Sequence, residues 1–113
     1  DLPLTMEATR AAGSSLGSGV VMVLDQSVDM VDQLRRIAAF FRDESCGQCV
    51  PCRVGTVRQE EIVSRLAKGV QSQDIELLRE LGTVMRDASI CGLGQTANSA
   101  IDSAINKLKV FAV

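Results

Sequence analysis

The most informative absence from this sequence is histidine. The 113 residues include no His, Trp or Tyr and only three Phe, namely Phe40, Phe41 and Phe111. Without His there is no imidazole metal ligand and no imidazole acid–base catalyst, so a metal site must use Cys, Asp or Glu. A core without large aromatic rings must be built from Leu, Ile, Val, Met and Ala, which favours packed helices.

The chain also lacks a basic stretch and a long apolar run. Its formal net charge is −2, which excludes the electrostatic footprint of a nucleic-acid-binding protein. No apolar run is longer than that at residues 20–24, which is far too short to cross a bilayer, so no direct membrane insertion is expected. Because no signal peptide is apparent, we expect a cytoplasmic location, including the cytoplasmic face of a membrane-bound complex.

One short segment predicts a β-strand. Residues 20–24 are apolar and mostly β-branched, and they follow residues 1–19, which we interpret as a loop because of their Gly and Ser content. A single strand has no ladder partner. Since the sequence contains no second convincing strand, the partner strands are expected outside this chain.

From Ser27 onward, apolar residues recur at steps of three and four, which predicts amphipathic helices. Ser27 or Asp29 is expected to cap the first helix, and Val54 and Val57 are expected on the buried face of the second. The predicted fold class is mainly α, a small four-helix bundle preceded by one β-strand. The expected helices cover residues 27–44, 51–69, 72–88 and 96–108.

Four cysteines carry the chemistry that the sequence predicts. Cys46, Cys49 and Cys52 form a C-x-x-C-x-x-C motif between the first two helices, and Cys91 lies in a Gly-rich loop between the last two. Chain reversals in an up-down bundle place these two loops at the same end. Two-residue gaps let one loop bind three irons of a cubane while a remote cysteine binds the fourth, so all four cysteines are candidate ligands of a [4Fe-4S] cluster.

Other roles for the cysteines are weaker, but one stays open. A redox-active CxxC pair belongs near a βαβ pattern, which is absent. A structural zinc site commonly uses two separated pairs, yet a Zn(Cys)4 tetrahedron in a helical interaction domain remains the alternative. Three arginines are candidates either to raise the reduction potential of a nearby cluster or to be ordinary solvated residues: Arg53, Arg58 and Arg86.

The cysteine motifs resemble a known family. Residues 44–56 (ESCGQCVPCRVGT) and 85–97 (MRDASICGLGQTA) are similar to the iron–sulfur region of the NADH-oxidising flavoprotein subunit of respiratory complex I. They are also similar to its relatives in NAD-reducing hydrogenases and NAD-dependent formate dehydrogenases. The resemblance extends upstream over residues 12–25 and covers nearly the whole chain. The four cysteines match the cluster ligands of the family one by one.

The resemblance implies a domain division and a function. Residues 1–26 would be the remnant of a ubiquitin-like (β-grasp) domain with a linker, and residues 27–113 the helical [4Fe-4S]-binding domain. The implied function is an electron-transfer module that carries electrons from NADH-reduced FMN to the next redox centre. The implied partners are the flavin/NADH domain of the same subunit and other Fe–S or catalytic subunits. The Gly-rich flavin and nicotinamide region is missing, so FMN and NAD belong to the parent protein, and this chain alone is not expected to oxidise NADH.

Overall fold

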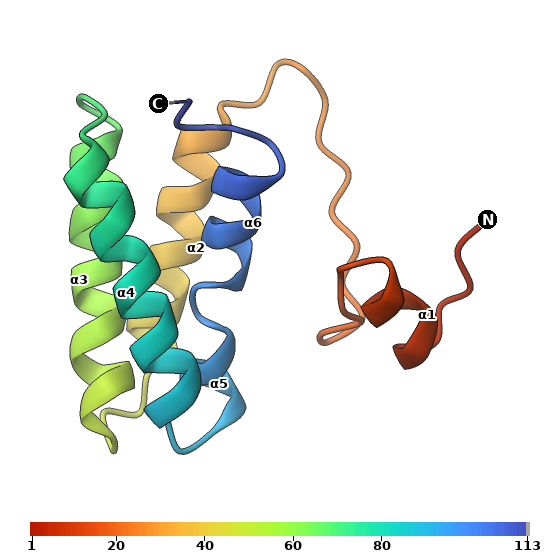
Figure 1. Ribbon diagram of the computed structural model, residues 1–113, viewed down its shortest axis with the longest axis horizontal. Coiled ribbons are helices and arrows are strands. Elements are labelled where there is room, and N and C mark those ends of the chain that lie inside the picture. Colours follow the sequence, from red (N-terminus) through yellow and green to blue (C-terminus); the bar gives the residue numbers. More distant parts are fainter. Residues whose placement is uncertain (113) are drawn as a thin grey trace.

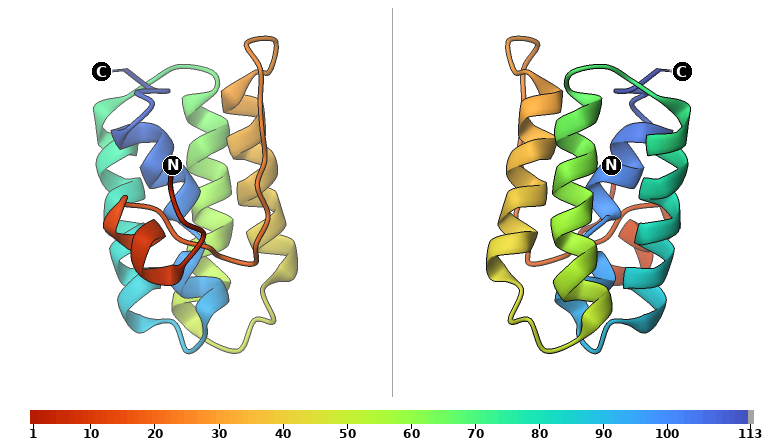
Figure 2. Two further views of the ribbon diagram at one scale, coloured as in Figure 1. Left: turned by 90° about the vertical axis from the view of Figure 1, so that its right-hand side faces the viewer. Right: turned by 90° about the vertical axis from the view of Figure 1, so that its left-hand side faces the viewer.

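The computed structural model describes residues 1–112 as a mainly helical chain, which confirms the predicted fold class at that level. In Figure 1 the long helices lie side by side, short helices follow one another alongside them, and the first helix lies apart from the bundle. The two side views in Figure 2 agree with this arrangement. No helix among the described residues is both long and apolar enough to cross a membrane. The helices are α1 (Met6–Ala11), α2 (Met30–Glu44), α3 (Val50–Leu66), α4 (Ser72–Ala88), α5 (Gly92–Thr96) and α6 (Ser99–Asn106).

The chain reverses direction between successive long helices. Residues 45–49 connect α2 to α3, and residues 89–91 connect α4 to α5. Both connections lie at the lower end of the bundle in Figure 1, while the α3–α4 connection lies at the upper end. The two cysteine-bearing loops therefore share one end of the bundle, as the up-down topology predicts.

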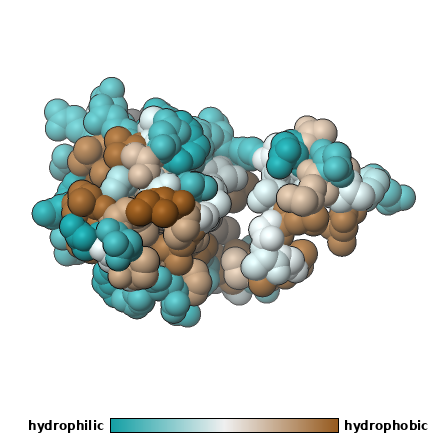
Figure 3. Space-filling view, turned by 90° about the horizontal axis from the view of Figure 1, so that it is seen from below, coloured by the Kyte–Doolittle hydropathy of each residue, from teal (hydrophilic) through white to brown (hydrophobic). Residues whose placement is uncertain are grey.

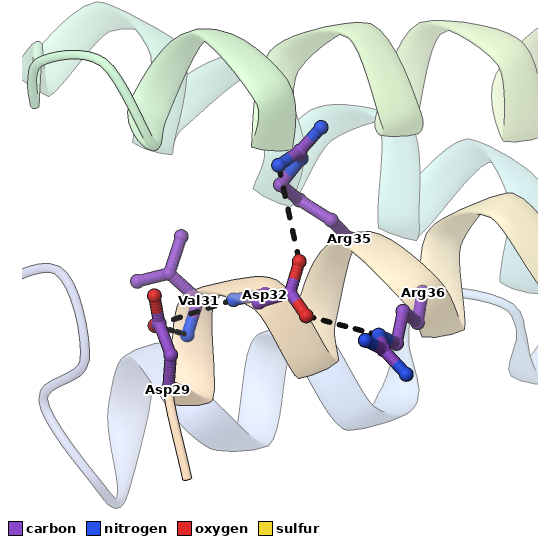
Figure 4. Close-up of polar contacts among 5 residues, drawn as sticks. All are labelled: Asp29, Val31, Asp32, Arg35 and Arg36. Carbon is purple, nitrogen blue, oxygen red and sulfur yellow. Dashed lines mark hydrogen bonds and ion pairs between the residues drawn. The ribbon is translucent and has the colours of Figure 1, made fainter.

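The start of α2 is fixed by a side-chain cap. The Asp29 carboxylate accepts hydrogen bonds from the backbone N–H groups of Val31 (2.9 Å) and Asp32 (3.3 Å), as Figure 4 shows. These bonds satisfy donors that the first helical turn leaves free. Ser27 instead donates its hydroxyl to Asp25, so Asp29 is the cap of the two candidates.

The apolar core occupies the half of the bundle away from the cysteine loops. It draws on the first half of α2, the second half of α3, the first half of α4, and α6 with the chain that follows it. Near the loops, the buried face of α3 is small or polar instead. The core residues are Leu34, Ala38, Ile62, Val63, Leu66, Ile75, Leu78, Ile101, Ala104, Ile105 and Phe111.

The predicted buried face of the second helix is wrong in its first half. Val54 and Val57 are exposed, whereas the residues buried there are Cys52, Gly55, Thr56 and Gln59. These four lie at helical steps of three and four that continue into the apolar core. The buried face is therefore continuous with Cys52, and the valines lie beside it.

The N-terminal segment differs from its prediction in two ways. The strand expected at residues 20–24 is not formed among the described residues, and its side chains are 41% to 90% exposed. This agrees with the argument that a lone strand has no ladder partner. Residues 6–11, predicted as loop, form α1 because the Thr5 hydroxyl accepts the N–H of Ala8 and caps a helical turn.

The fourth predicted helix is divided. Instead of one helix from about Thr96, α5 begins at Gly92 directly after Cys91. The helix is interrupted around Asn98, before α6 begins. The break packs against Gly82 of α4, where an added Cβ would lie 2.0 Å from the Asn98 Nδ2 atom. A side chain at position 82 would displace the Asn98 side chain, so the glycine lets the turn between α5 and α6 lie close to α4.

Candidate metal centre

The first cysteine loop is a tight turn that leads directly into a helix. Cys46 and Cys49 precede α3, and Cys52 lies in its first turn. Gly47 has φ of +75°, a left-handed conformation that residues with a side chain rarely adopt. Pro51 lies in the first turn of α3, where its missing N–H breaks no helical bond. This turn leaves Cys52 buried, Cys49 half-buried and Cys46 exposed.

Two side chains hold the peptide groups of Gly47. The Gly47 N–H donates to the Ser45 Oγ atom at 3.3 Å, and the Gly47 carbonyl accepts from the Arg53 Nη1 atom at 2.7 Å. The same Ser45 Oγ atom lies 3.3 Å from the Cys52 sulfur. The conformation of the loop is thus tied both to the end of α2 and to the first turn of α3.

The second cysteine loop packs closely on the first. Cys91 is the exposed N-cap residue of α5. An added Cβ on Gly94, in the middle of α5, would lie 2.3 Å from the Ser89 Oγ atom and 2.9 Å from the Cys52 Cβ atom. The short helix after Cys91 therefore lies directly against the helical turn that carries Cys52.

Groups of both loops lower the pKa of the Cys49 thiol. The Ile90 N–H, and next the Cys52 N–H, lower the pKa of the Cys49 thiol below its ordinary value of 9.0 by favouring the thiolate, against an opposing effect of burial. The buried Ser89 hydroxyl adds to the same lowering but has no partner at hydrogen-bond geometry. A thiolate is the form of cysteine that binds metal. Groups of both loops therefore favour the thiolate form of Cys49.

A buried amide braces the second loop from α3. The Gln59 side chain is fully buried, and its Nε2 atom donates to the Ala97 carbonyl at 3.0 Å. Gln59 lies two helical turns after Cys52 on the same face of α3, and Ala97 ends α5. The bond therefore links the helix that carries Cys52 to the short helix that follows Cys91.

Sequence reasoning did not find Ser45 or Gln59. The available signals were the position of Ser45 directly before Cys46, and the spacing of seven residues between Cys52 and Gln59, which places both on one face of a helix.

The arginines proposed from the sequence have other partners. Arg53 donates to the loop carbonyl described above, Arg58 pairs with Glu61 at 2.6 Å, and Arg86 pairs with Asp87 at 2.8 Å. Arg58 and Arg86 thus have neighbouring carboxylates that compensate their charge. The structure supports a role for Arg53 in holding the loop, and among the described residues it gives no direct contact between these arginines and the sulfurs.

The chemistry of the donor set, four thiols, suits an iron–sulfur cluster. A Zn(Cys)4 site needs four sulfurs at about 2.3 Å from one ion. In residues 1–112, no group of three or more His, Cys, Asp or Glu side chains is arranged to hold one ion. In a cubane each cysteine binds a different iron, so the four sulfurs lie farther apart than around one metal ion. Four thiols on two adjoining loops suit such a cluster.

Comparison with known proteins gives the same assignment. Residues 32–110 match the model of the NADH-ubiquinone oxidoreductase-F iron-sulfur binding region. The chain is 36% identical to "NADP-reducing hydrogenase subunit HndC" of Solidesulfovibrio fructosivorans, over 94% of this chain and 22% of the relative. It is also 36% identical to the F subunit of an NADH-quinone oxidoreductase of Rickettsia bellii, over 94% of this chain and 26% of the relative.

A solved structure extends the similarity to the fold. A chain in the crystal structure of an NAD+-reducing [NiFe]-hydrogenase in the H2-reduced state matches with a TM-score of 0.75 and 38% identity, covering 80% of this chain and 16% of that one. The chain thus spans about a quarter or less of the proteins that it matches. The helical bundle with its two cysteine loops belongs to the family of the NADH-ubiquinone oxidoreductase-F iron-sulfur binding region, whose cofactor is a [4Fe-4S] cluster.

Proposed function

We propose that this chain is an electron-transfer module that carries electrons from NADH-reduced FMN to the next redox centre of an NADH-linked oxidoreductase. The observation that carries the proposal is the meeting of the two cysteine loops at one end of the bundle, where Gly94, three residues after Cys91, packs against the Cys52 Cβ atom. The family match and the two similar proteins, named as subunits of a hydrogenase and a quinone oxidoreductase, support the same function.

The proposed ligands of the cluster are Cys46, Cys49, Cys52 and Cys91. When bound, a [4Fe-4S] cluster supplies one-electron transfer. The remaining contribution of this chain is structural and electrostatic. Gly47 supplies the left-handed turn of the first loop, Gly94 lets the second loop pack against the first, and backbone groups lower the pKa of the Cys49 thiol.

The parent protein is proposed to supply the flavin and nicotinamide chemistry. Residues 27–113 would form the [4Fe-4S]-binding domain, and residues 1–26 the remnant of a ubiquitin-like domain with its linker. The exposed apolar residues 20–24 would then pair with strands elsewhere in the parent protein, which would bury them and satisfy their backbone. The proposed partners are the flavin/NADH domain of the same subunit and other Fe–S or catalytic subunits of the complex.

The cysteine end of the bundle has a surface suited to such a partner. Val50 and Ile90 directly follow and precede proposed ligands, and they are 58% and 73% exposed. Figure 3, which views the molecule from this end, shows hydrophobic residues gathered among polar ones on the bundle. Exposed apolar residues beside a redox centre support the proposal that another domain covers this surface in the assembled protein.

The proposal is tested by anaerobic purification of the natively assembled protein with iron and sulfide analysis. We expect Cys91→Ser to lose the cluster of this chain or convert it to one with fewer irons, because one of four thiolate ligands is removed. The measurement is the number of irons and sulfides per protein, together with the visible absorption that dithionite bleaches.

Ser99→Ala is the control variant, since Ser99 lies nearby at the start of α6 and is exposed. It should keep the full iron content. An intact four-iron cluster in Cys91→Ser would defeat the ligand assignment. A colourless native protein with one zinc bound by the cysteines would defeat the function itself.

A further inference from the structure

We propose that Ser45 tunes the reduction potential of the centre by donating a hydrogen bond to the Cys52 sulfur. This inference rests on the proposed function, because it concerns the cluster that Cys52 would help to hold. Ser45 acts through a ligand, so it is a positioning residue and not itself a ligand.

The direction of the hydrogen bond follows from the chemistry of its two atoms. The Ser45 Oγ atom already accepts the N–H of Gly47 at 3.3 Å, and it lies 3.3 Å from the Cys52 sulfur. A hydroxyl has one hydrogen to donate, and the bond from Gly47 uses only an acceptor position. A cysteine that binds iron is a thiolate without a proton, so it can only accept. The hydroxyl hydrogen of Ser45 is therefore directed at the sulfur.

The surroundings favour a persistent interaction. Cys52 is the most buried of the four cysteines, at 5% exposed, so little water competes for its sulfur. Ser45 is half-buried and is the C-cap of α2, where its backbone N–H donates to the Arg42 carbonyl. The hydroxyl is thus positioned by a helix end on one side and by the Gly47 turn on the other. A hydrogen bond in such a site is electrostatically stronger than one in water.

The expected effect is on the stability of the reduced state. Reduction adds negative charge that is shared with the ligand sulfurs. A donor hydrogen bond to a ligand sulfur stabilises that charge and raises the reduction potential. Loss of the Ser45 hydroxyl should therefore make the centre harder to reduce.

The test is a redox titration of the natively assembled protein, followed through the electron paramagnetic resonance signal of the reduced cluster. Ser45→Ala should shift the midpoint potential to a more negative value. Ser45→Thr keeps a hydroxyl at the same position and should restore the wild-type potential. Ser64→Ala removes a half-buried hydroxyl from the far half of α3 and serves as the control with an unchanged potential. The signal reports only occupied sites, so incomplete assembly of a variant does not distort the comparison.

Two outcomes would overturn the inference. One is an unchanged potential in Ser45→Ala with a full cluster. The other is complete loss of the cluster in Ser45→Ala but not in Ser45→Thr. That result would mean that Ser45 is needed for cluster assembly and does not set the reduction potential. A wild-type protein in which this chain holds no four-iron cluster would instead overturn the proposed function, and it would be recognised before any variant is made.

Discussion

At the scale of single residues, the contact between the two cysteine loops depends on a missing side chain. Gly94 lies in α5 at a position where a side chain would meet both loops. A methyl group there would lie 2.3 Å from the Ser89 Oγ atom, 2.6 Å from its Cβ atom and 2.9 Å from the Cys52 Cβ atom. Two of these three atoms are β-carbons, fixed to the backbone. The loops could accept a methyl group only by moving apart.

We therefore expect Gly94→Ala to lower the free energy of unfolding by about 1–3 kcal/mol, the usual cost of overpacking. It should also reduce the iron content, because separation of the loops moves Cys91 away from the other cysteines. Denaturant unfolding and iron analysis of the native protein measure the two effects. Gly92→Ala is the matched control, since a Cβ on Gly92 meets no atom within 4 Å. Equal effects from the two substitutions would contradict the packing argument.

At the scale of elements, local patterns predicted the long helices. Tertiary contacts determine which helix faces are buried and where the last helix is divided. The apolar spacing and Asp29 gave α2, and the Pro51 position gave the start of α3. The helical spacing of apolar residues predicted Val54 and Val57 on the buried face. That spacing does not show that a cysteine and a glutamine are buried there instead. Likewise, the division of the last helix follows from the space at Gly82, which lies in another element and cannot be read from local propensity.

The candidate site was predictable to a similar extent. The C-x-x-C-x-x-C spacing with a remote cysteine, and the up-down topology, predicted two loops at one end of the bundle. Neither pattern assigns a role to Ser45 or Gln59, although the seven-residue spacing places Gln59 on the same helix face as Cys52. Their roles appear only when the chain is folded and a hydroxyl lies against a sulfur.

The turn at the other end of the bundle is held by an ion pair between two elements. Arg65, near the end of α3, donates to the Asp74 carboxylate in the first turn of α4 at 2.6 Å. This hydrogen bond lowers the pKa of Asp74 below its ordinary value of 3.8. A carboxyl with a lowered pKa in the folded state stabilises the fold above the unfolded pKa. That stabilisation is lost as the pH falls from 3.8 through the lower folded value.

A double-mutant cycle on Arg65→Gln and Asp74→Asn measures this contribution. Arg65 is 53% exposed and Asp74 13% exposed, so solvent screens the pair, and we expect a coupling of about 0.2–1 kcal/mol at neutral pH. The coupling should be smaller at a pH well below 3.8, because protonation of the carboxyl removes its charge. A coupling that stays constant between these two conditions would show that the contact is not electrostatic.

At the scale of the whole molecule, the bundle has two unlike halves. The half distant from the cysteines contains the contiguous apolar core, with Leu34, Ile62 and Leu78 almost fully buried. The half near the cysteines buries mostly small and polar residues beside Met85. Among the described residues, three of its buried polar side-chain atoms have no hydrogen-bond partner: Gln59 Oε1, Ser89 Oγ and Asn98 Oδ1. Apolar burial stabilises the first half, while the second half has little apolar surface to bury.

Metal binding should therefore stabilise the two halves unequally. Removing the cluster with a chelator leaves the cysteine half without the bonds that join its loops, because binding free energy at a metal site is also folding free energy. We expect amide hydrogen exchange to rise by about tenfold or more in α5 and the first turn of α3. The segments of α3 and α4 that contribute Ile62 and Leu78 should stay protected. The measurement is hydrogen exchange by mass spectrometry on the natively assembled protein with and without iron. A uniform loss of protection through α3 and α4 would mean that the apolar half cannot stay folded alone, and it would refute this division of the molecule.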